Sequence, residues 1–528
     1  MNTKTQKINL FSIQIPVSYL VLFLLIQGIF VRLFLLGTIP GGLNQDEAFS
    51  GYEAYSLLHY GMDSSGYSFP VYLTTWGSGM SALNSYLMIP FMALFGAQTW
   101  VLRLPQALTA CISLFVCYKL LYRLFDVRTA LLGLLLLTIC PWHIIMARWG
   151  LDCNLAPGFL LFGLYFFVCG MDHPKFFMLS ALFYGLSLYC YATIWPLVPL
   201  ILCLQCVYLL YTGKLRLTIY LLFSVLILAL LALPLLCFLL VNNGYMDEVR
   251  TSFFSIPKMP YMRASDISFA HMPENFNQLC STIFQENDQL YWNAAPETGL
   301  YGKGVLFLAV LGFAYCVKRT VCSFLTKTFD GSVLIWIQFL TAVLLGCVIS
   351  ININRINCIH LPILMMAAIG LNCLLRISGL FFRYSSYVVT IMYLILFLLF
   401  ISFYFDTYAE NIGSVFQEGL EDSVSFAMEL AEDSETEFIE VASDYCYSKI
   451  LFYSRLPVTE YLDTVTYTNY PSAFLALREA GPFRFGISQF GQHGIFIIPA
   501  HMAGQYRVKG YGVEIFGNTA VAWLMRGK

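Results

Sequence analysis

Long apolar runs separated by short polar joints fill most of the first 405 residues of the chain. About eleven of these runs have the hydropathy of helices that cross a membrane. They are residues 17–37, 103–124, 129–146, 153–171, 176–196, 197–212, 217–240, 304–317, 332–350, 358–377 and 385–405. The pattern predicts a polytopic α-helical membrane protein. A further apolar run at 80–96 is short and interrupted by Pro90, so we expect an interfacial or re-entrant helix there.

The pattern changes after about residue 405, where charged residues become frequent. The segment EDSVSFAMELAEDS has helical periodicity, whereas EFIEVAS, GIFIIPA and TAVAWLM are typical of strands. We therefore expect two domains. Residues 1–405 form the transmembrane domain, and residues 406–528 form a small soluble domain of the α/β or α+β class.

Composition agrees with this class of protein. Hydrophobic residues make up 59% of the chain and charged residues only 11%, which excludes a soluble protein of this length. Most of the 16 cysteines lie inside apolar runs, where a thiol behaves as a small hydrophobic group. We expect neither a disulfide framework nor a metal site. The near-neutral net charge of −2 gives no reason to expect a nucleic acid partner.

Basic residues occur in alternate joints between the predicted spans, as the positive-inside rule requires when the N-terminus is cytoplasmic. The main members of this set are Lys119, Arg123, Arg128, Lys175, Lys214, Arg216, Lys318, Arg319, Lys327, Arg376 and Arg383. This orientation places the loops 38–102 and 241–303 and the C-terminal domain on the outer side of the membrane.

The stretch GGLNQDEAFSGYEAYSLLHYG, residues 41–61, follows the first span and carries two adjacent acids, Asp46 and Glu47. Its spacing predicts a helix that starts near Asp46 and has Gly61 in the C-cap position. One interpretation is structural, because acids at a helix N-terminus favour the helix dipole. The other is catalytic, because the same dipole keeps a carboxylate ionised and able to accept a proton.

Four arginines at the outer ends of spans favour the catalytic interpretation: Arg32, Arg103, Arg148 and Arg355. Charges near the hydrocarbon are costly and are usually paired or functional. An arginine binds phosphate oxygens through two parallel hydrogen bonds. An outward cavity with carboxylates and arginines suits an anionic, lipid-linked substrate. Two alternatives stay open, since Arg148 is four residues before Asp152 and fits a structural salt bridge, and Arg355 fits a snorkelling anchor.

Aromatic residues and one histidine are further candidates for substrate binding. Tyr52, Tyr55 and Trp76 belong to the first outward loop, where aromatic rings either stack on sugars or occupy the membrane interface. His143 follows a Pro-Trp pair at the outer end of a span and is either a ligand or a packed, hydrogen-bonded side chain.

Four blocks of the sequence together resemble a known group. They are Arg32 with GGLNQDEAFSGYEAYSLL and its G-x-D-x-x-G turn, LNSYLMIPFMALFG with VLRLPQALTA, PWHIIMARWGLDCNL, and NRINCIHLPILMMAAIGL. Their order and spacing resemble the GT-C superfamily of membrane glycosyltransferases, in the branch of the protein O-mannosyltransferases (family 39) and the aminoarabinose transferases. The resemblance is closest over residues 17–200, looser to residue 405, and architectural in the C-terminal domain.

This resemblance implies an enzyme that moves a hexosyl or pentosyl group, with inversion, from a polyprenyl phosphate to an acceptor hydroxyl on the outer face of the membrane. Asp46 is then the general base, Glu47 its neighbour in the acidic motif and Asp152 a second outward acid. The arginines bind the lipid phosphate or orient the carboxylates. The acceptor is a protein, a lipid or a cell-envelope glycan, and no cofactor or divalent metal is expected. Large lumenal repeat domains typical of eukaryotic members are absent, which favours a bacterial plasma-membrane enzyme.

Two other classes of function fit a polytopic membrane protein. A transporter or flippase of lipid-linked saccharides predicts inverted repeats and polar residues halfway along broken helices. A sensor or assembly scaffold leaves the paired acids and their arginines without a role.

Overall fold

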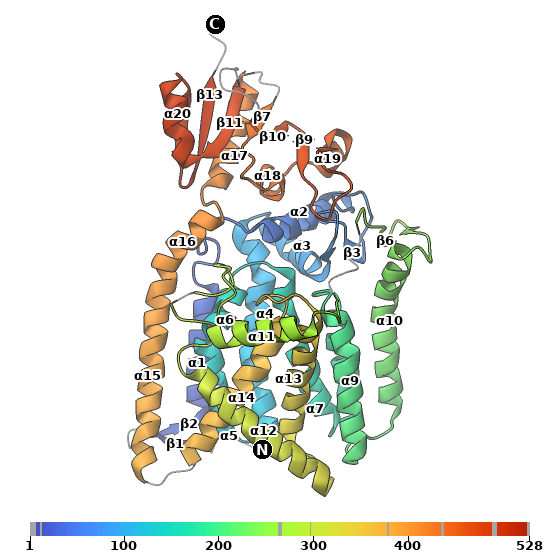
Figure 1. Cartoon of the computed structure of the whole chain (residues 1–528), viewed down its shortest axis with the longest axis vertical. Coiled ribbons are helices and arrows are strands. Elements are labelled where there is room, and N and C mark those ends of the chain that lie inside the picture. Colours follow the sequence, from blue (N-terminus) through green and yellow to red (C-terminus); the bar gives the residue numbers. More distant parts are fainter. Residues whose placement is uncertain are drawn as a thin grey trace.

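The computed structural model describes residues 7–10, 13–261, 267–295, 297–376, 380–434, 438–487 and 494–524. Long helices run side by side through one part of the molecule, and a domain containing a β-sheet covers one end of them (Figure 1). The predicted fold class, a polytopic helical protein with a small C-terminal α/β domain, is confirmed.

Seven helices of the described residues are long and apolar enough to cross a membrane, and up to nine if each of two bent pairs counts as one span. The seven are α4 (Thr99–Leu124), η2 with α7 (Asp152–Gly170), α9 (Ile194–Tyr211), α10 (Ile219–Asn242), α12 (Val305–Thr326), α13 (Gly331–Val348) and η3 with α14 (Asn357–Arg376). The bent pairs are α5 (Val127–Ile139) with α6 (Pro141–Ala147), and the end of α15 (Leu380–Phe405) with α16 (Thr407–Val415).

The two remaining predicted spans are shorter helices. They are α1 (Val17–Leu33) and α8 (Phe176–Ser187), with 17 and 12 residues. A helix of 12 residues is only about 18 Å long, so α8 alone is shorter than the hydrocarbon core of a bilayer. The apolar run 176–196 therefore contains a helix break that hydropathy does not reveal.

A layer of short elements lies between the long helices and the C-terminal domain (Figure 1). It contains α2 (Gln45–Tyr60), the strand pair β3 (Tyr72–Leu73) and β4 (Met80–Ser81), and α3 (Leu83–Phe95). Because α3 has only 13 residues and packs on α2 and α4, the run 80–96 forms a helix shorter than the candidate spans, as its length and Pro90 predict. On the same side of the bundle are β5 (Val249–Arg250), β6 (Ser255–Ile256) and the helix α11 (Met272–Gln285). At the N-terminus, β1 (Lys7–Leu10) pairs with β2 (Ile13–Pro16).

The C-terminal domain is built on a seven-stranded mixed sheet in the order β12-β13-β11-β7-β10-β9-β8. Its strands are β7 (Ile439–Val441), β8 (Thr466–Tyr467), β9 (Leu477–Ala480), β10 (Phe483–Phe485), β11 (Gly494–Pro499), β12 (Gly512–Phe516) and β13 (Thr519–Leu524). β7 is parallel to both of its neighbours, and the other pairs are antiparallel. Its helices are α17 (Leu420–Ser434), α18 (Tyr447–Ser454), α19 (Val458–Thr464) and α20 (Ala503–Val508), with the short turn η4 (Ala500–Met502).

The central strands are apolar at nearly every position, so the sheet has a core on each face. Ile495 and Ile497 of β11 pack with α17, whereas Phe496 and Ile498 pack with Tyr506 of α20. Short continuous apolar runs of this kind explain why GIFIIPA and TAVAWLM are recognisable as strands from sequence.

The C-terminal domain is joined to the transmembrane part through α18, which packs on α2. A shared apolar core includes Phe49 of α2 with Leu451 and Phe452 of α18. In addition, the Tyr52 hydroxyl donates a hydrogen bond to the carbonyl oxygen of Leu456 at 2.9 Å. The domain therefore fixes the helix that carries Asp46 and Glu47.

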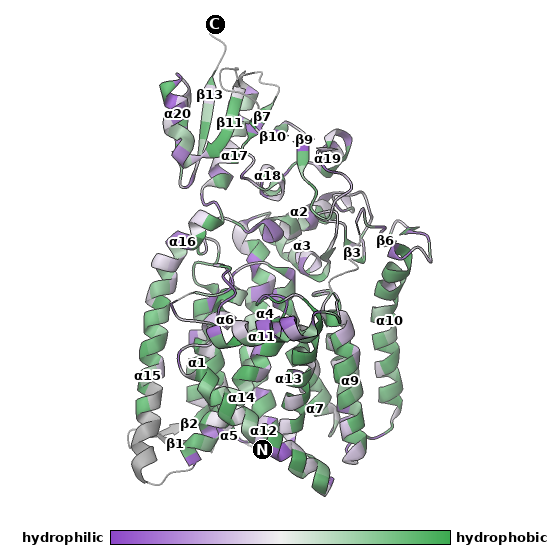
Figure 2. Ribbon diagram, viewed as in Figure 1, coloured by the Kyte–Doolittle hydropathy of each residue, from purple (hydrophilic) through white to green (hydrophobic). Residues whose placement is uncertain are grey.

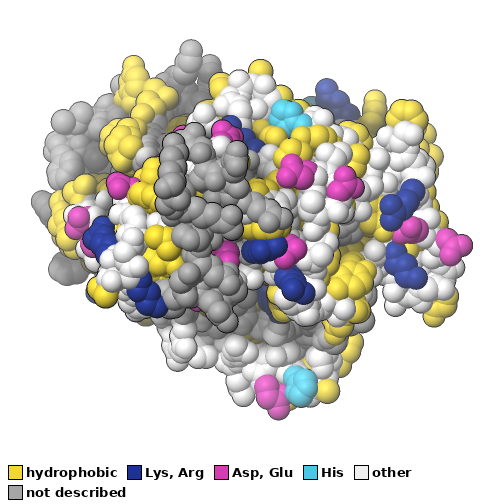
Figure 3. All heavy atoms as spheres, turned by 90° about the horizontal axis from the view of Figure 1, so that it is seen from above, with side chains coloured by type: hydrophobic (Ala, Val, Ile, Leu, Met, Phe, Trp, Pro, Cys, Tyr) yellow, Lys and Arg dark blue, Asp and Glu magenta, His cyan; other side chains and the backbone are white. Residues whose placement is uncertain are grey.

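Hydropathy follows this architecture. The long helices are predominantly apolar, and polar residues concentrate in the layer above them and in the C-terminal domain (Figure 2). Seen from the side of the C-terminal domain, the coloured basic and acidic side chains are interspersed over the visible face (Figure 3). Such mixed charge is typical of a solvent-exposed domain surface.

Candidate active site

The first turn of α2 presents its two acids to different surroundings. Asn44 caps the helix by accepting the backbone N–H of Asp46, and Glu47 accepts the backbone N–H of Asn44. This capping box fixes the start of α2. Gly61 ends the helix in the left-handed conformation, at φ 69°, as the sequence predicts. Asp46 is half-buried, whereas Glu47 is completely buried.

Glu47 forms an ion pair inside the protein. Its Oε1 atom lies 2.9 Å from Nε of Arg103 and accepts the backbone N–H of Gly150 at 2.7 Å. The same arginine donates to the carbonyl oxygens of residues 36, 40 and 42. Both side chains are 0% exposed. Glu47 and Arg103 thus hold the loop before α2 against α4, and neither lines the cavity described next.

A cavity of about 520 Å³ lies beneath the C-terminal domain, at one end of the long helices. Asp46, Asp152 and Arg355 all line it, although they come from three distant parts of the sequence. Its other side is apolar and includes Trp195 of α9 and Phe238 of α10. The structure thereby brings together one residue from each acidic segment and one of the four candidate arginines.

Asp46 is oriented by an aromatic neighbour. The indole Nε1 atom of Trp76 donates a hydrogen bond to Asp46 Oδ1 at 2.8 Å. Trp76 also lines the cavity, and its ring contacts that of Phe49 with centroids 4.7 Å apart. The bond therefore fixes the orientation of the Asp46 carboxylate at the cavity wall.

Asp152 begins the short helix η2 and is 5% exposed. Its Oδ1 atom accepts the backbone N–H of Cys153 at 2.7 Å, and its Oδ2 atom accepts that of Ser81 at 3.3 Å. These bonds hold the carboxylate at the cavity wall.

Arg355 lies in the joint between α13 and α14. Its backbone N–H donates to Asn352 Oδ1, and its guanidinium donates to the Ser350 hydroxyl. Asp288, from the segment after α11, also holds this loop, because its carboxylate accepts the backbone N–H of Ile353 at 2.9 Å. Arg355 is half-buried and lines the cavity together with Asn352 and Asn354.

The other candidate arginines require a correction. Arg32 is 0% exposed and donates to His143 Nδ1 and to the carbonyl oxygens of Leu137 and Thr138. Arg148 is also 0% exposed, donates to three carbonyl oxygens of residues 31–39, and does not pair with Asp152. Helix α6 ends at Ala147, so the four-residue spacing between those two residues does not put them on one helix face.

Three more candidates lie outside the cavity. His143 is buried and accepts the hydrogen bond from Arg32, so it is a packed histidine. Tyr52 is 1% exposed and bonds to the C-terminal domain, and Tyr55 packs against the ring of His59. Of the aromatic candidates, only Trp76 lines the cavity.

Several cavity residues were not predicted. Asn352 and Asn354 alternate with isoleucines in the stretch ININR, a pattern that indicates a partly exposed extended segment. Tyr191 and Phe474 also line the cavity. Phe474 belongs to the C-terminal domain, and the sequence carries no signal that this residue reaches the membrane-proximal site.

A second acidic pair lies in the layer of short elements that contains α2. Glu53 and Asp63 are both 0% exposed, and hydroxyl groups of Ser64, Thr74 and Thr75 donate to them. Burial raises the pKa of Glu53 to about 8, with a further contribution from Asp63, and burial raises the pKa of Asp63 to about 6. Asp63 also accepts two backbone N–H bonds of its own turn, as the G-x-D-x-x-G motif predicts.

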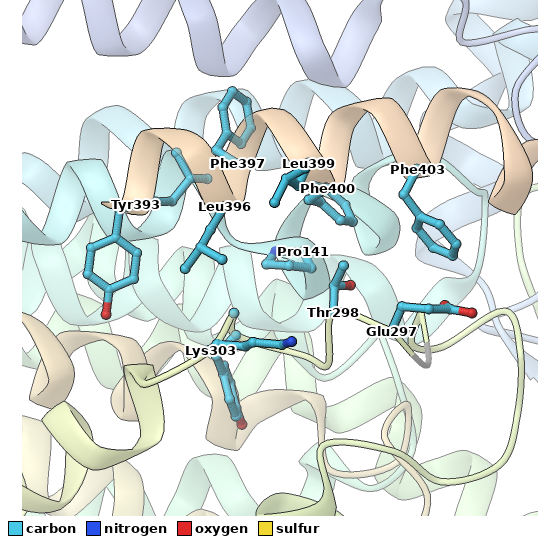
Figure 4. A pocket seen from close by; sticks show the side chains of 13 residues that line it. Pro141, Glu297, Thr298, Lys303, Tyr393, Leu396, Phe397, Leu399, Phe400 and Phe403 are labelled. Carbon is cyan, nitrogen blue, oxygen red and sulfur yellow. The ribbon is translucent and has the colours of Figure 1, made fainter. Parts of the chain in front are cut away.

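A smaller cavity of about 250 Å³ lies elsewhere, between α15 and the segment that precedes α12. Apolar side chains of α15 face Lys303, Thr298 and Glu297 across it (Figure 4). None of the predicted site residues lines it. Among the described residues, no group of three or more His, Cys, Asp or Glu side chains is arranged to hold a metal ion.

Comparison with known proteins identifies the fold. The family model of dolichyl-phosphate-mannose-protein mannosyltransferases matches residues 81–239. The crystal structure of ArnT from Cupriavidus metallidurans in the apo state matches with 14% sequence identity and a TM-score of 0.52, over 96% of this chain and 97% of that one. The chain has a GT-C fold of the mannosyltransferase and ArnT type. ArnT from the same organism bound to undecaprenyl phosphate matches with 13% identity and a TM-score of 0.51, over 96% and 97%.

The GT-C likeness extends over the C-terminal domain as well as the long helices, because the match to ArnT covers nearly the whole of both chains. The predicted fold, that of the GT-C proteins, is therefore confirmed. No curated protein matches the sequence.

Proposed function

We propose that this protein transfers a sugar from a polyprenyl-phosphate donor to an acceptor hydroxyl, with Asp46 as the general base and Arg355 binding the donor phosphate. The observation that carries this proposal is that Asp46, Asp152 and Arg355 line one cavity at the end of a membrane-spanning bundle. The ArnT structure with undecaprenyl phosphate supports the donor class, because that protein has the same fold.

The two sides of the cavity suit the two parts of such a donor. The apolar wall formed by Trp195 and Phe238 accommodates the first isoprene units. Arg355, Asn352 and Asn354 provide N–H donors for the phosphate oxygens. A donor held in this way presents its sugar between Arg355 and Asp46.

The chemistry follows from this placement. The acceptor oxygen forms a bond to the anomeric carbon while the bond from that carbon to the phosphate oxygen breaks. Asp46 takes the proton of the attacking hydroxyl, and the electron pair of the broken bond leaves on the lipid phosphate. Because attack and departure take place on opposite faces, the anomeric configuration inverts. The guanidinium of Arg355 stabilises the negative charge that develops on the phosphate.

Asp152 and Trp76 have supporting roles in this mechanism. Asp152, held by two backbone N–H groups, places a carboxylate near the sugar, where positive charge develops on the ring. Trp76 orients Asp46 through its indole N–H. No divalent metal takes part, since Arg355 supplies the positive charge at the leaving group.

The orientation of the protein in the membrane, its location and its acceptor are part of the same proposal. The N-terminus is cytoplasmic, the cavity and the C-terminal domain face outward, and the enzyme lies in a bacterial plasma membrane. A hexose or a pentose is transferred to a protein, a lipid or a cell-envelope glycan. A transporter would bind its substrate halfway along the spans, whereas Asp46, Asp152 and Arg355 line a cavity that Phe474 of the C-terminal domain also lines.

The decisive experiment measures release of polyprenyl phosphate from a polyprenyl-phosphate sugar in the presence of an acceptor extract. We expect Asp46→Asn to lower the rate by about 10²–10⁴-fold, the usual contribution of a general base. Binding of undecaprenyl phosphate should change little. Turnover of the Asp46→Asn protein at the wild-type rate would remove Asp46 from the mechanism.

A further inference from the structure

The C-terminal domain contributes a side chain to the cavity. The turn of residues 468–476, between β8 and β9, reaches down to the membrane-proximal layer, and Phe474 at its tip lines the same cavity as Asp46. Phe474 is 57% exposed, so a large part of its ring faces open space. An exposed phenylalanine inside a site that is otherwise built from the transmembrane part calls for a functional explanation.

The backbone of this turn forms hydrogen bonds with residues 74–79. The backbone N–H of Leu475 donates to the carbonyl oxygen of Trp76 at 2.8 Å, and the Ser78 hydroxyl donates to that of Ala473 at 2.8 Å. Gly77 pairs with Phe474 as an antiparallel bridge. A Cβ atom on Gly77 would lie 2.4 Å from the carbonyl oxygen of Ser472, so this close approach requires glycine.

The docked turn also holds Trp76 in an unusual conformation. Trp76 has φ 65°, which is uncommon for a bulky residue and costs conformational energy. Its carbonyl oxygen accepts the bond from Leu475, and its indole N–H donates to Asp46. The rings of Trp76 and Phe474 meet nearly at a right angle, 83°, with centroids 5.6 Å apart. They therefore form a corner beside the carboxylate.

From these contacts we infer that Phe474 and Trp76 form a binding subsite for a sugar ring of the acceptor, placed so that one of its hydroxyl groups faces Asp46. This inference rests on the proposed function and adds to it that the acceptor is a carbohydrate. A pyranose has an apolar C–H face that packs on an aromatic ring and a polar rim that requires hydrogen bonds. Gln45 and Ser78 line the cavity next to the corner and provide such groups. A peptide acceptor would be bound largely through its backbone, and an aromatic corner offers little to that backbone.

Two soluble probes test the subsite without knowledge of the natural acceptor: methyl β-D-glucopyranoside and a nonapeptide rich in Ser and Thr. Saturation-transfer NMR on the full chain in lipid nanodiscs reports which ring protons contact the protein. We expect transfer to the C–H protons of the glycoside and little to the peptide. Phe474→Ala should weaken glycoside binding by up to about tenfold, the size of a single aromatic contact, and Phe474→Tyr should retain it.

Matched controls separate binding from folding. Phe253→Ala removes an exposed aromatic ring, 86% exposed compared with 57% for Phe474, from an outward loop that does not line the cavity. Gly96→Ala introduces the same backbone strain as Gly77→Ala, at φ 80° and 94°, but meets no atom within 4 Å. Gly77→Ala should therefore weaken glycoside binding, whereas Gly96→Ala and Phe253→Ala should not.

Three results would overturn the inference: no transfer to the glycoside in the wild-type protein, equal glycoside binding in Phe474→Ala, or transfer to the peptide that depends on Phe474. Asp46→Asn distinguishes this inference from the proposed function. It should abolish sugar transfer while the glycoside still binds. If Asp46→Asn keeps full turnover while Phe474→Ala loses glycoside binding as expected, Asp46 is not the general base but the inferred subsite is supported.

Discussion

Two groups of charged residues at the end of the spans next to the C-terminal domain have different surroundings. Asp46, Asp152 and Arg355 line a cavity, and each is held by a few hydrogen bonds. Arg32, Arg103 and Arg148 are 0% exposed, and their donors are used by carbonyl oxygens, by His143 and by Glu47. The second group holds together the backbone that positions the first.

The adjacent acids of α2 show the difference most clearly. Asp46 and Glu47 are adjacent in the sequence, yet Asp46 lines the cavity and Glu47 forms a buried ion pair. Successive residues of a helix point about 100° apart, so an acidic pair at a helix start reaches two different surroundings. A motif of two acids therefore combines a cavity-lining residue and a structural residue.

The largest expected effect concerns this pair. Glu47→Gln leaves Arg103 buried without its counter-charge, and breaking a buried ion pair costs about 3–5 kcal/mol. Asp46→Asn keeps the shape of a half-exposed side chain, and its effect on stability should stay within about 0.5 kcal/mol. Thermal unfolding in detergent measures both. An unchanged unfolding midpoint for Glu47→Gln would contradict the structural role given to this ion pair.

Arg355 and Arg148 provide the next test. Arg355→Lys removes the forked guanidinium and should weaken binding of undecaprenyl phosphate by about tenfold, close to 1.4 kcal/mol. Arg148→Lys should instead lower the unfolding temperature, because one ammonium cannot reach the three carbonyl oxygens that Arg148 bonds. Isothermal titration of the lipid phosphate separates the two. Equal loss of affinity in both variants would show that the division between cavity and interior is wrong.

A pH effect of smaller size should come from the buried pair Glu53 and Asp63. The pKa of Glu53 is raised from 4.5 to about 8 in the folded protein, so the folded state favours the protonated acid. Its stabilising contribution is complete below pH 4.5 and is lost as the pH rises through about 8. The unfolding midpoint should fall over this window, and Glu53→Gln should flatten the fall. An unfolding midpoint that rises with pH over this window would contradict the raised pKa of Glu53.

The smallest effect is expected for the removal of divalent metals. In the proposed mechanism Arg355 supplies the positive charge at the leaving phosphate, so treatment with EDTA should leave turnover unchanged. Loss of activity that Mg²⁺ or Mn²⁺ restores would require a metal beside Asp46 and Asp152.

The spans and the start of α2 were predictable because hydropathy and capping are local properties of the sequence. The run 17–37 and the motif ending at Gly61 need no distant contact to be recognised. The role of an arginine is not local. Arg148 and Arg355 both lie in short polar joints, and only the folded chain shows that carbonyl oxygens surround the first and a cavity faces the second.

Phe474 was beyond prediction for the same reason. Its place in the cavity depends on how the C-terminal domain docks on α2 and on the loop 74–79, and these contacts join residues about 400 positions apart. The short apolar runs of β11 and β13 predict a sheet but not the surface that the loops of the sheet contact.

The position of β13 has a consequence for synthesis of the protein. The last described strand, Thr519–Leu524, is inserted between β12 and β11, so the sheet gains its full strand order only after residue 524 has been synthesised. A chain truncated before residue 519 would lack β13 and expose the edge of β11. The strands β7, β10, β9 and β8 pair on the other side of β11, so the half of the sheet that carries the turn with Phe474 is made first and does not need β13 as a neighbour.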